Sequence, residues 1–125
     1  MEKTSSVDKL ESIKSMRSTI RKLESSLARV SRKGANTVLV KKRLKASCIG
    51  LAMLENVWNQ KPHDYTKEDL AEGCQVLAGL LPSLENSYAK LNARSPQRTL
   101  LERRIKALEL AVQAIANPSS IDGLN

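Results

Sequence analysis

Residues 23–30, LESSLARV, and residues 84–91, LENSYAKL, decide the fold of this chain of 125 residues. In each stretch apolar residues recur at steps of three and four, which is the spacing of one face of an α-helix. The stretches lie 61 positions apart, and at that offset residues 5–54 align without a gap onto residues 66–115, with ten identical positions. Chance at ordinary composition gives about three. We therefore predict that one helical hairpin occurs twice in the chain.

Four segments carry an apolar seam of this kind, and none alternates with the period of two that a strand needs. The seams predict an all-α fold, an antiparallel four-helix bundle made of two tandem, internally duplicated helical hairpins. The seam positions are Ile13, Met16, Ile20, Leu23, Leu27 and Val30; Val40, Leu44, Leu51, Leu54 and Trp58; Cys74, Leu77, Leu81, Leu84, Tyr88 and Leu91; and Leu101, Ile105, Leu108, Val112 and Ile115.

The ends of the predicted helices carry matching signals. Ser5 with Asp8 and Thr66 with Asp69 place a hydroxyl before a helix and an acid three residues later, which is a variant of the capping box. The second hairpin turns at Ser95-Pro96, an N-cap followed by a proline in the first helical position. In the first hairpin Gly34 is the expected C-terminal cap, and Asn36 or Thr37 restarts the helix.

These signals divide one domain, residues 1–125, into four parts. Hairpin 1 spans about 5–61, a linker 61–65, hairpin 2 about 66–116, and a mobile tail 117–125. Small residues at 46, 50, 107 and 111 predict that the second and fourth helices approach closely. Pro82 lies inside the third helix, where it removes a backbone hydrogen bond and predicts a kink.

Charge is unevenly distributed along the chain, which has 21 Lys and Arg against 13 Asp and Glu, a net charge of +8. The five-residue linker spans at most about 18 Å, too short to run back along a helix of about 37 Å, so we expect both hairpin turns at one end of the bundle. The sequence around both turns is rich in Lys and Arg. The predicted partner-binding residues are Arg29, Arg32, Lys33, Lys41, Lys42, Arg43, Lys45, Arg94, Arg98, Arg103, Arg104 and Lys106.

Some of these cations have a purely structural explanation. Arg29, Arg32 and Lys33 lie near a helix C-terminus, where the helix dipole favours positive charge. Lys41 and Lys42 lie in the first turn of a helix, where the dipole opposes it. We therefore expect the basic end to bind an anion, although a solvated surface without function explains the same charge run.

The sequence predicts a non-catalytic binding or regulatory module that docks an acidic protein or the phosphate backbone of a nucleic acid. Aromatic residues make up only 2% of the chain, which disfavours stacking on bases, so nucleic-acid binding would have weak sequence preference. The alternative is a structural adaptor or small inhibitor or immunity-type protein that acts through helix faces or homo-oligomerisation, for example as a homodimer.

Other function classes lack their signatures. Cys48, Cys74 and His63 are too few and too far apart for a zinc site, and no cofactor, metal or catalytic motif is recognised, so we expect no enzyme. No apolar run approaches the ~20 residues of a membrane span, so no integral membrane association is expected. Two cysteines without a disulfide pattern favour a cytoplasmic protein.

Overall fold

The computed structural model describes residues 6–118 and Ile121, and this part of the chain forms four helices and no strand. The helices are α1 (Ser6–Arg32), α2 (Val38–Asn59), α3 (Lys67–Lys90) and α4 (Pro96–Ala116). The all-helical prediction is confirmed. Helix α3 continues through Pro82, which is exposed.

Local polar contacts define the helix ends largely as predicted. Thr66 and Asp69 form a reciprocal capping box, in which the Thr66 hydroxyl accepts from the Asp69 N–H at 3.1 Å and the Asp69 carboxylate accepts from the Thr66 N–H at 3.2 Å. Ser95 caps α4 by accepting from the Gln97 N–H at 3.2 Å. Gly34, at φ +72°, ends α1 in the left-handed region that glycine favours. The predicted Ser5 cap lies outside the described residues.

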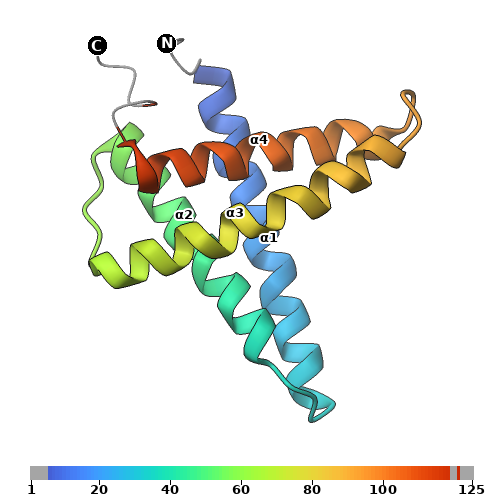
Figure 1. Ribbon diagram of the computed structural model, residues 1–125, viewed down its shortest axis with the longest axis horizontal. Coiled ribbons are helices and arrows are strands. Elements are labelled where there is room, and N and C mark those ends of the chain that lie inside the picture. Colours follow the sequence, from blue (N-terminus) through green and yellow to red (C-terminus); the bar gives the residue numbers. More distant parts are fainter. Residues whose placement is uncertain (1–5, 119–120, 122–125) are drawn as a thin grey trace.

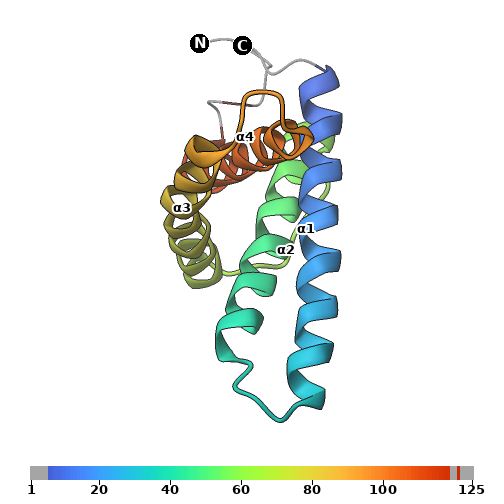
Figure 2. The same cartoon turned by 90° about the vertical axis from the view of Figure 1, so that its right-hand side faces the viewer.

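The four helices form two hairpins that cross each other (Figures 1 and 2). In Figure 1 the turn between α1 and α2 lies at the bottom, whereas the turn between α3 and α4 lies at the right. The prediction that both turns share one end of the molecule is therefore wrong. The linker fixes only where α3 begins, near the end of α2, and the direction of α3 is set by packing at the crossing.

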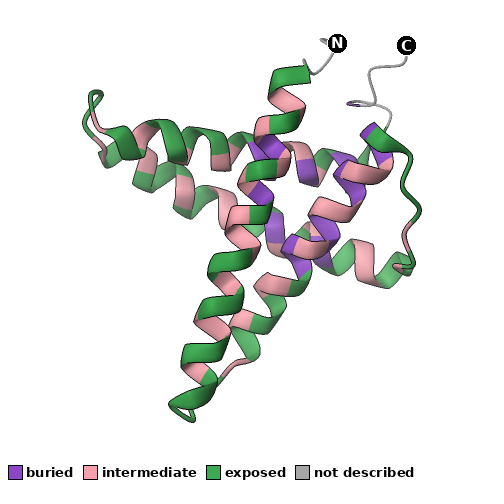
Figure 3. Ribbon diagram, turned by 180° about the vertical axis from the view of Figure 1, so that it is seen from behind, coloured by how far each residue is buried: buried purple, intermediate pink, exposed green. Residues whose placement is uncertain are grey.

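The core is confined to the crossing of the hairpins (Figure 3). Residues 17–45 and residues 78–106, which we call the first and second arms, contain no fully buried residue. Apart from Ile121, the buried apolar side chains come from the other halves of the helices, mainly from α2 and α4. They are Met16, Ala46, Ile49, Met53, Leu54, Val57, Trp58, Leu77, Ala107, Leu108, Ala111, Ala114 and Ile121.

The predicted close approach of the second and fourth helices is confirmed at the centre of this core. A Cβ added to Gly50 would lie 3.1 Å from the Cβ of Ala111, and Ala46 and Ala107 are also buried. Small residues allow two helix backbones to approach at this point. A steep crossing concentrates such contact in a short length of each helix, which leaves the arms outside the core.

Part of the segment expected to be a mobile tail is attached to the core. Ile121 is buried, and its carbonyl oxygen accepts a hydrogen bond of 3.0 Å from the indole N–H of Trp58. Trp58, the last large residue of the α2 core face, is itself only 8% exposed. Ile121 therefore packs against the end of α2.

Candidate anion-binding groove

The twelve predicted partner-binding residues do not form one basic end. Seven belong to the first arm and five to the second. Because the arms point in different directions, the cations near the two turns are separated (Figure 1). Arg29, Arg32, Lys33, Lys41, Lys42, Arg43 and Lys45 lie on the first arm, and Arg94, Arg98, Arg103, Arg104 and Lys106 lie on the second.

Three of these cations are partnered by carboxylates of the other hairpin. The Nζ of Lys45 lies 3.1 Å from Asp69, and the Nζ of Lys106 lies 3.1 Å from Asp8. Arg103 lies 3.5 Å from Glu11. These cations join α2 to α3 and α4 to α1, so part of their role is structural.

Arg98 also has local partners. Its guanidinium donates to the carbonyl oxygen of Leu91 at 3.2 Å and lies 4.2 Å from the centre of the Tyr88 ring. These contacts tie the start of α4 to the end of α3. Arg98 therefore stabilises the turn of the second arm.

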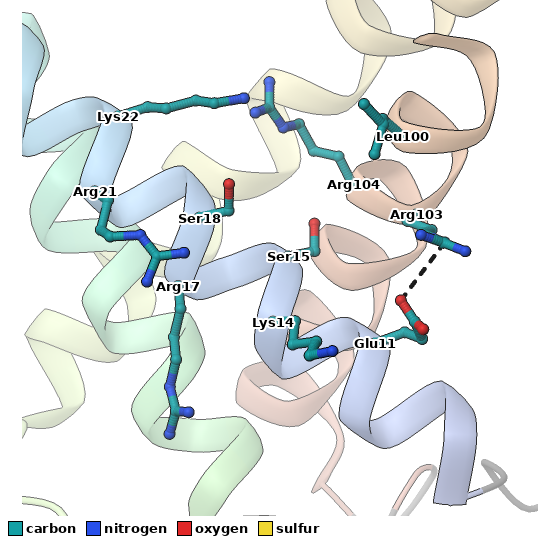
Figure 4. A pocket seen from close by; sticks show the side chains of 10 residues that line it. All are labelled: Glu11, Lys14, Ser15, Arg17, Ser18, Arg21, Lys22, Leu100, Arg103 and Arg104. Carbon is teal, nitrogen blue, oxygen red and sulfur yellow. Dashed lines mark ion pairs between the residues drawn. The ribbon is translucent and has the colours of Figure 1, made fainter. Parts of the chain in front are cut away.

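A cationic groove opens between α1 and α4, where the first hairpin crosses the second (Figure 4). Its volume is about 590 Å³. Six Lys and Arg side chains and one carboxylate line it, together with two hydroxyls and one apolar side chain. The lining residues are Glu11, Lys14, Ser15, Arg17, Ser18, Arg21, Lys22, Leu100, Arg103 and Arg104.

The charged groups of the groove are only partly neutralised. Glu11, its one carboxylate, is paired with Arg103 at 3.5 Å, and Arg17 is paired with Glu55 of α2 at 3.3 Å. In contrast, Lys22 and Arg104 point toward each other across the groove from α1 and α4 (Figure 4). No ion pair within residues 6–118 involves either of them. Two like charges that face each other repel unless an anion lies between them.

The cationic surface continues along α1 beyond the groove. A shallower depression is lined by Ser18, Arg21, Lys22, Ser25 and Arg29, which leads toward the tip of the first arm. From Lys14 to Arg29 the helix rises about 22 Å. Hydroxyl and cationic side chains thus alternate along one exposed face of α1.

Sequence reasoning found part of this surface and missed the rest. It included Arg29, Arg103 and Arg104, but not the α1 wall of the groove. The residues missed are Lys14, Ser15, Arg17, Ser18, Arg21 and Lys22. Their helical spacing on one face of α1 is a visible signal in the sequence, but they lie away from the two turns, where the basic end was predicted. Their nearness to α4 depends on the crossing of the hairpins.

The two cysteines are free thiols, both half-buried. Burial raises the pKa of the Cys48 thiol, which disfavours its reactive thiolate. Within the part of the chain that the structure describes, no three His, Cys, Asp or Glu residues are grouped as metal ligands. None of the described helices combines the length and the apolar character required to cross a bilayer.

Comparison of the chain with protein-family models, with curated proteins and with solved structures finds no significant match. The groove is therefore interpreted from its own geometry.

Proposed function

We propose that this protein is a non-catalytic binding module that docks an anionic macromolecule on the groove between α1 and α4. The observation that carries the proposal is the convergence of Lys22 and Arg104 from two different helices without a carboxylate between them. Charge of one sign gathered in a concave surface attracts and orients an oppositely charged partner.

The repeat offers an internal comparison that favours binding over a structural role for these charges. At the offset of 61 residues, the α3 positions equivalent to the α1 wall carry no charge: they are Gln75, Val76, Ala78, Gly79, Pro82 and Ser83. The α4 wall does keep its charge, because Arg103 and Arg104 correspond to Lys42 and Arg43. A hairpin of this type therefore forms without the cations of α1.

The same correspondence provides a matched test. The full-length protein would be applied to a heparin column beside the variants Arg103→Gln/Arg104→Gln and Lys42→Gln/Arg43→Gln. Each variant loses two charges at equivalent positions, so net charge alone affects both equally. We expect the first variant to elute at clearly lower salt than the second. Equal elution would show that the groove is not the docking surface.

We also propose that the two hairpins arose by duplication and pack about an approximate two-fold axis. In two-fold packing each contact occurs twice with the partners exchanged. The ion pairs Lys45–Asp69 and Lys106–Asp8 fit this rule, because each residue of one pair lies 61 positions from its counterpart in the other, and both distances are 3.1 Å. At the centre, Gly50 faces its own counterpart Ala111. The antiparallel character of the predicted bundle then holds within each hairpin.

Homo-oligomerisation is a second candidate function, favoured by an acidic depression on the second hairpin. Glu85, Glu102 and Glu109 line it together with Tyr88, Ile105 and Lys106. The cationic groove of one copy would dock on this depression of another. Sedimentation equilibrium at low and high salt tests the idea: we expect association that weakens with salt, and a monomer at low salt would exclude it. The two free cysteines support a cytoplasmic location for either function.

A further inference from the structure

We propose that the groove between α1 and α4 binds the phosphate backbone of double-stranded DNA. This inference rests on the proposed function and names its partner. Groups that contact DNA phosphates are mainly Arg and Lys, with hydroxyl and amide donors between them. The groove presents this combination, because Ser15 and Ser18 lie between the cations of α1. Arg21, Lys22 and Arg104 make no ion pair with any residue that the structure describes.

The apolar content of the groove argues against an acidic protein as its partner. Protein interfaces have an apolar or aromatic centre surrounded by polar residues. In this groove Leu100 is the single apolar lining residue, and it is 63% exposed. The other lining residues carry charged groups or hydroxyl groups. Such a surface suits a partner whose outer face is a continuous array of charge.

The distribution of aromatic side chains argues against single strands. Proteins that bind single strands stack bases on exposed aromatic rings. The three Trp and Tyr residues are all engaged elsewhere: Trp58 is buried, Tyr65 is half-buried, and the ring of Tyr88 is covered by Arg98. None lines the groove. The bases of a duplex are already stacked on each other, so a duplex needs no such platform.

The length of the cationic surface sets the expected number of phosphate contacts. Duplex DNA carries one charge per about 1.7 Å of its axis. A length of about 22 Å along α1 corresponds to roughly a dozen phosphates of the two strands together. Direct contacts are limited to about four or five by the cations that make no ion pair with the described residues, which are Lys14, Arg21, Lys22, Arg29 and Arg104. An RNA duplex carries the same phosphates and adds 2′-hydroxyl groups, so the test includes an RNA duplex of the same sequence.

The test is fluorescence anisotropy of the full-length protein with a labelled 20-base-pair DNA duplex between about 50 and 200 mM salt. We expect the logarithm of the association constant to fall against the logarithm of salt with a slope of about −4, a loss of affinity of a few hundredfold over this range. The variant Arg21→Gln/Lys22→Gln should bind more weakly and reduce the slope by about two. Circular dichroism checks that each variant is folded.

The control variant Arg32→Gln/Lys33→Gln removes two exposed charges at the C-terminal end of α1, outside the groove. We expect its slope to change clearly less. An equal change in both variants would overturn the groove as the DNA site. Tighter binding of the single strand, or of an RNA duplex of the same sequence, would overturn the choice of double-stranded DNA.

Poly-glutamate separates this inference from the proposed function. If the protein binds poly-glutamate through the groove but does not bind the duplex, the DNA inference is wrong and anion docking stands. If it binds no polyanion at low salt, both are wrong.

Discussion

The α2 backbone at Gly50 passes so close to Ala111 of α4 that a Cβ at Gly50 would lie 3.1 Å from the Ala111 Cβ. The same Cβ would lie 2.9 Å from Leu77 Cδ1 and 3.1 Å from Met16 Cε, so all four helices meet here. Leu77 and Met16 have flexible side chains that can move aside. Ala111 cannot, because its Cβ moves only with the α4 backbone. The crossing of the hairpins therefore depends on the absence of a side chain at residue 50.

Gly50→Ala should lower the free energy of unfolding by about 1–3 kcal/mol, because the overpacked crossing must separate. The control is Gly79→Ala in α3, where an added Cβ meets nothing within 4 Å. Alanine is the better helix former, so this control should raise stability by about 0.5–1 kcal/mol. Urea denaturation followed by circular dichroism measures both. Stabilisation by both substitutions would contradict the close approach.

The ion pair between Lys45 and Asp69 predicts a pH dependence of stability. Hydrogen bonds from Lys45 and from the Thr66 backbone lower the pKa of Asp69 below 3.8, and the hydrogen bond with Asp69 raises the pKa of Lys45 above 10.5. The contribution of Asp69 is complete above pH 3.8 and is lost as the pH falls through its lowered folded-state pKa. The contribution of Lys45 is complete below pH 10.5 and is lost as the pH rises through its raised value.

Asp69→Asn should therefore be less stable than the unmodified protein at neutral pH, and this difference should decrease as the pH falls below about 4. Urea titrations at several pH values measure it. Asp64→Asn is the control, because Asp64 is an exposed carboxylate of the linker with no hydrogen bond to the described residues. A difference for Asp69→Asn that stays constant down to low pH would rule out the ionic contribution.

The contact of Ile121 with Trp58 predicts that the C-terminal segment contributes to stability. Ile121→Ala should cost about 2 kcal/mol or more, because a buried aliphatic side chain is removed. The fluorescence of Trp58, the single tryptophan, should shift to longer wavelength as its ring becomes more exposed. Asn59→Ala, an exposed neighbour of Trp58, is the control. An unchanged emission spectrum in Ile121→Ala would mean that the segment does not cover the indole.

Burial of Cys48 predicts slow reaction with thiol reagents. Because burial raises its pKa, less thiolate is present at neutral pH than for a free cysteine. In a Cys74→Ser variant, which isolates Cys48, a chromogenic disulfide reagent should react slowly in the native state and fast in denaturant. Equal rates in the two states would contradict the environment found for this thiol.

Local sequence signals predicted the elements of this fold well, because they depend on neighbouring residues. The capping box at Thr66, the proline start of α4 and the glycine end of α1 are all present. The small residues at positions 50 and 111 also predicted correctly which helices approach each other. These features need only helical periodicity and backbone chemistry.

The relative direction of the two hairpins could not be predicted from these local sequence signals. The short linker limits the distance between the end of α2 and the start of α3, but it leaves the crossing angle free. The heptad-like seams suggested near-parallel axes, yet in the arms seam residues such as Leu27 and Leu84 are only half-buried. The groove was missed for this reason, since Lys22 and Arg104 become neighbours only through the crossing.

The restriction of the core to the crossing implies a gradient of protection along every helix. Backbone amides near Gly50 and Ala111 should exchange with deuterium only when the whole molecule unfolds, whereas those near Gly34 and Ser95 should exchange through local fraying. In each helix the half at the crossing is therefore rigid, and the half in the arm is flexible. Flexible arms would adjust to the curvature of the duplex that we propose as the partner, while the crossing keeps its shape.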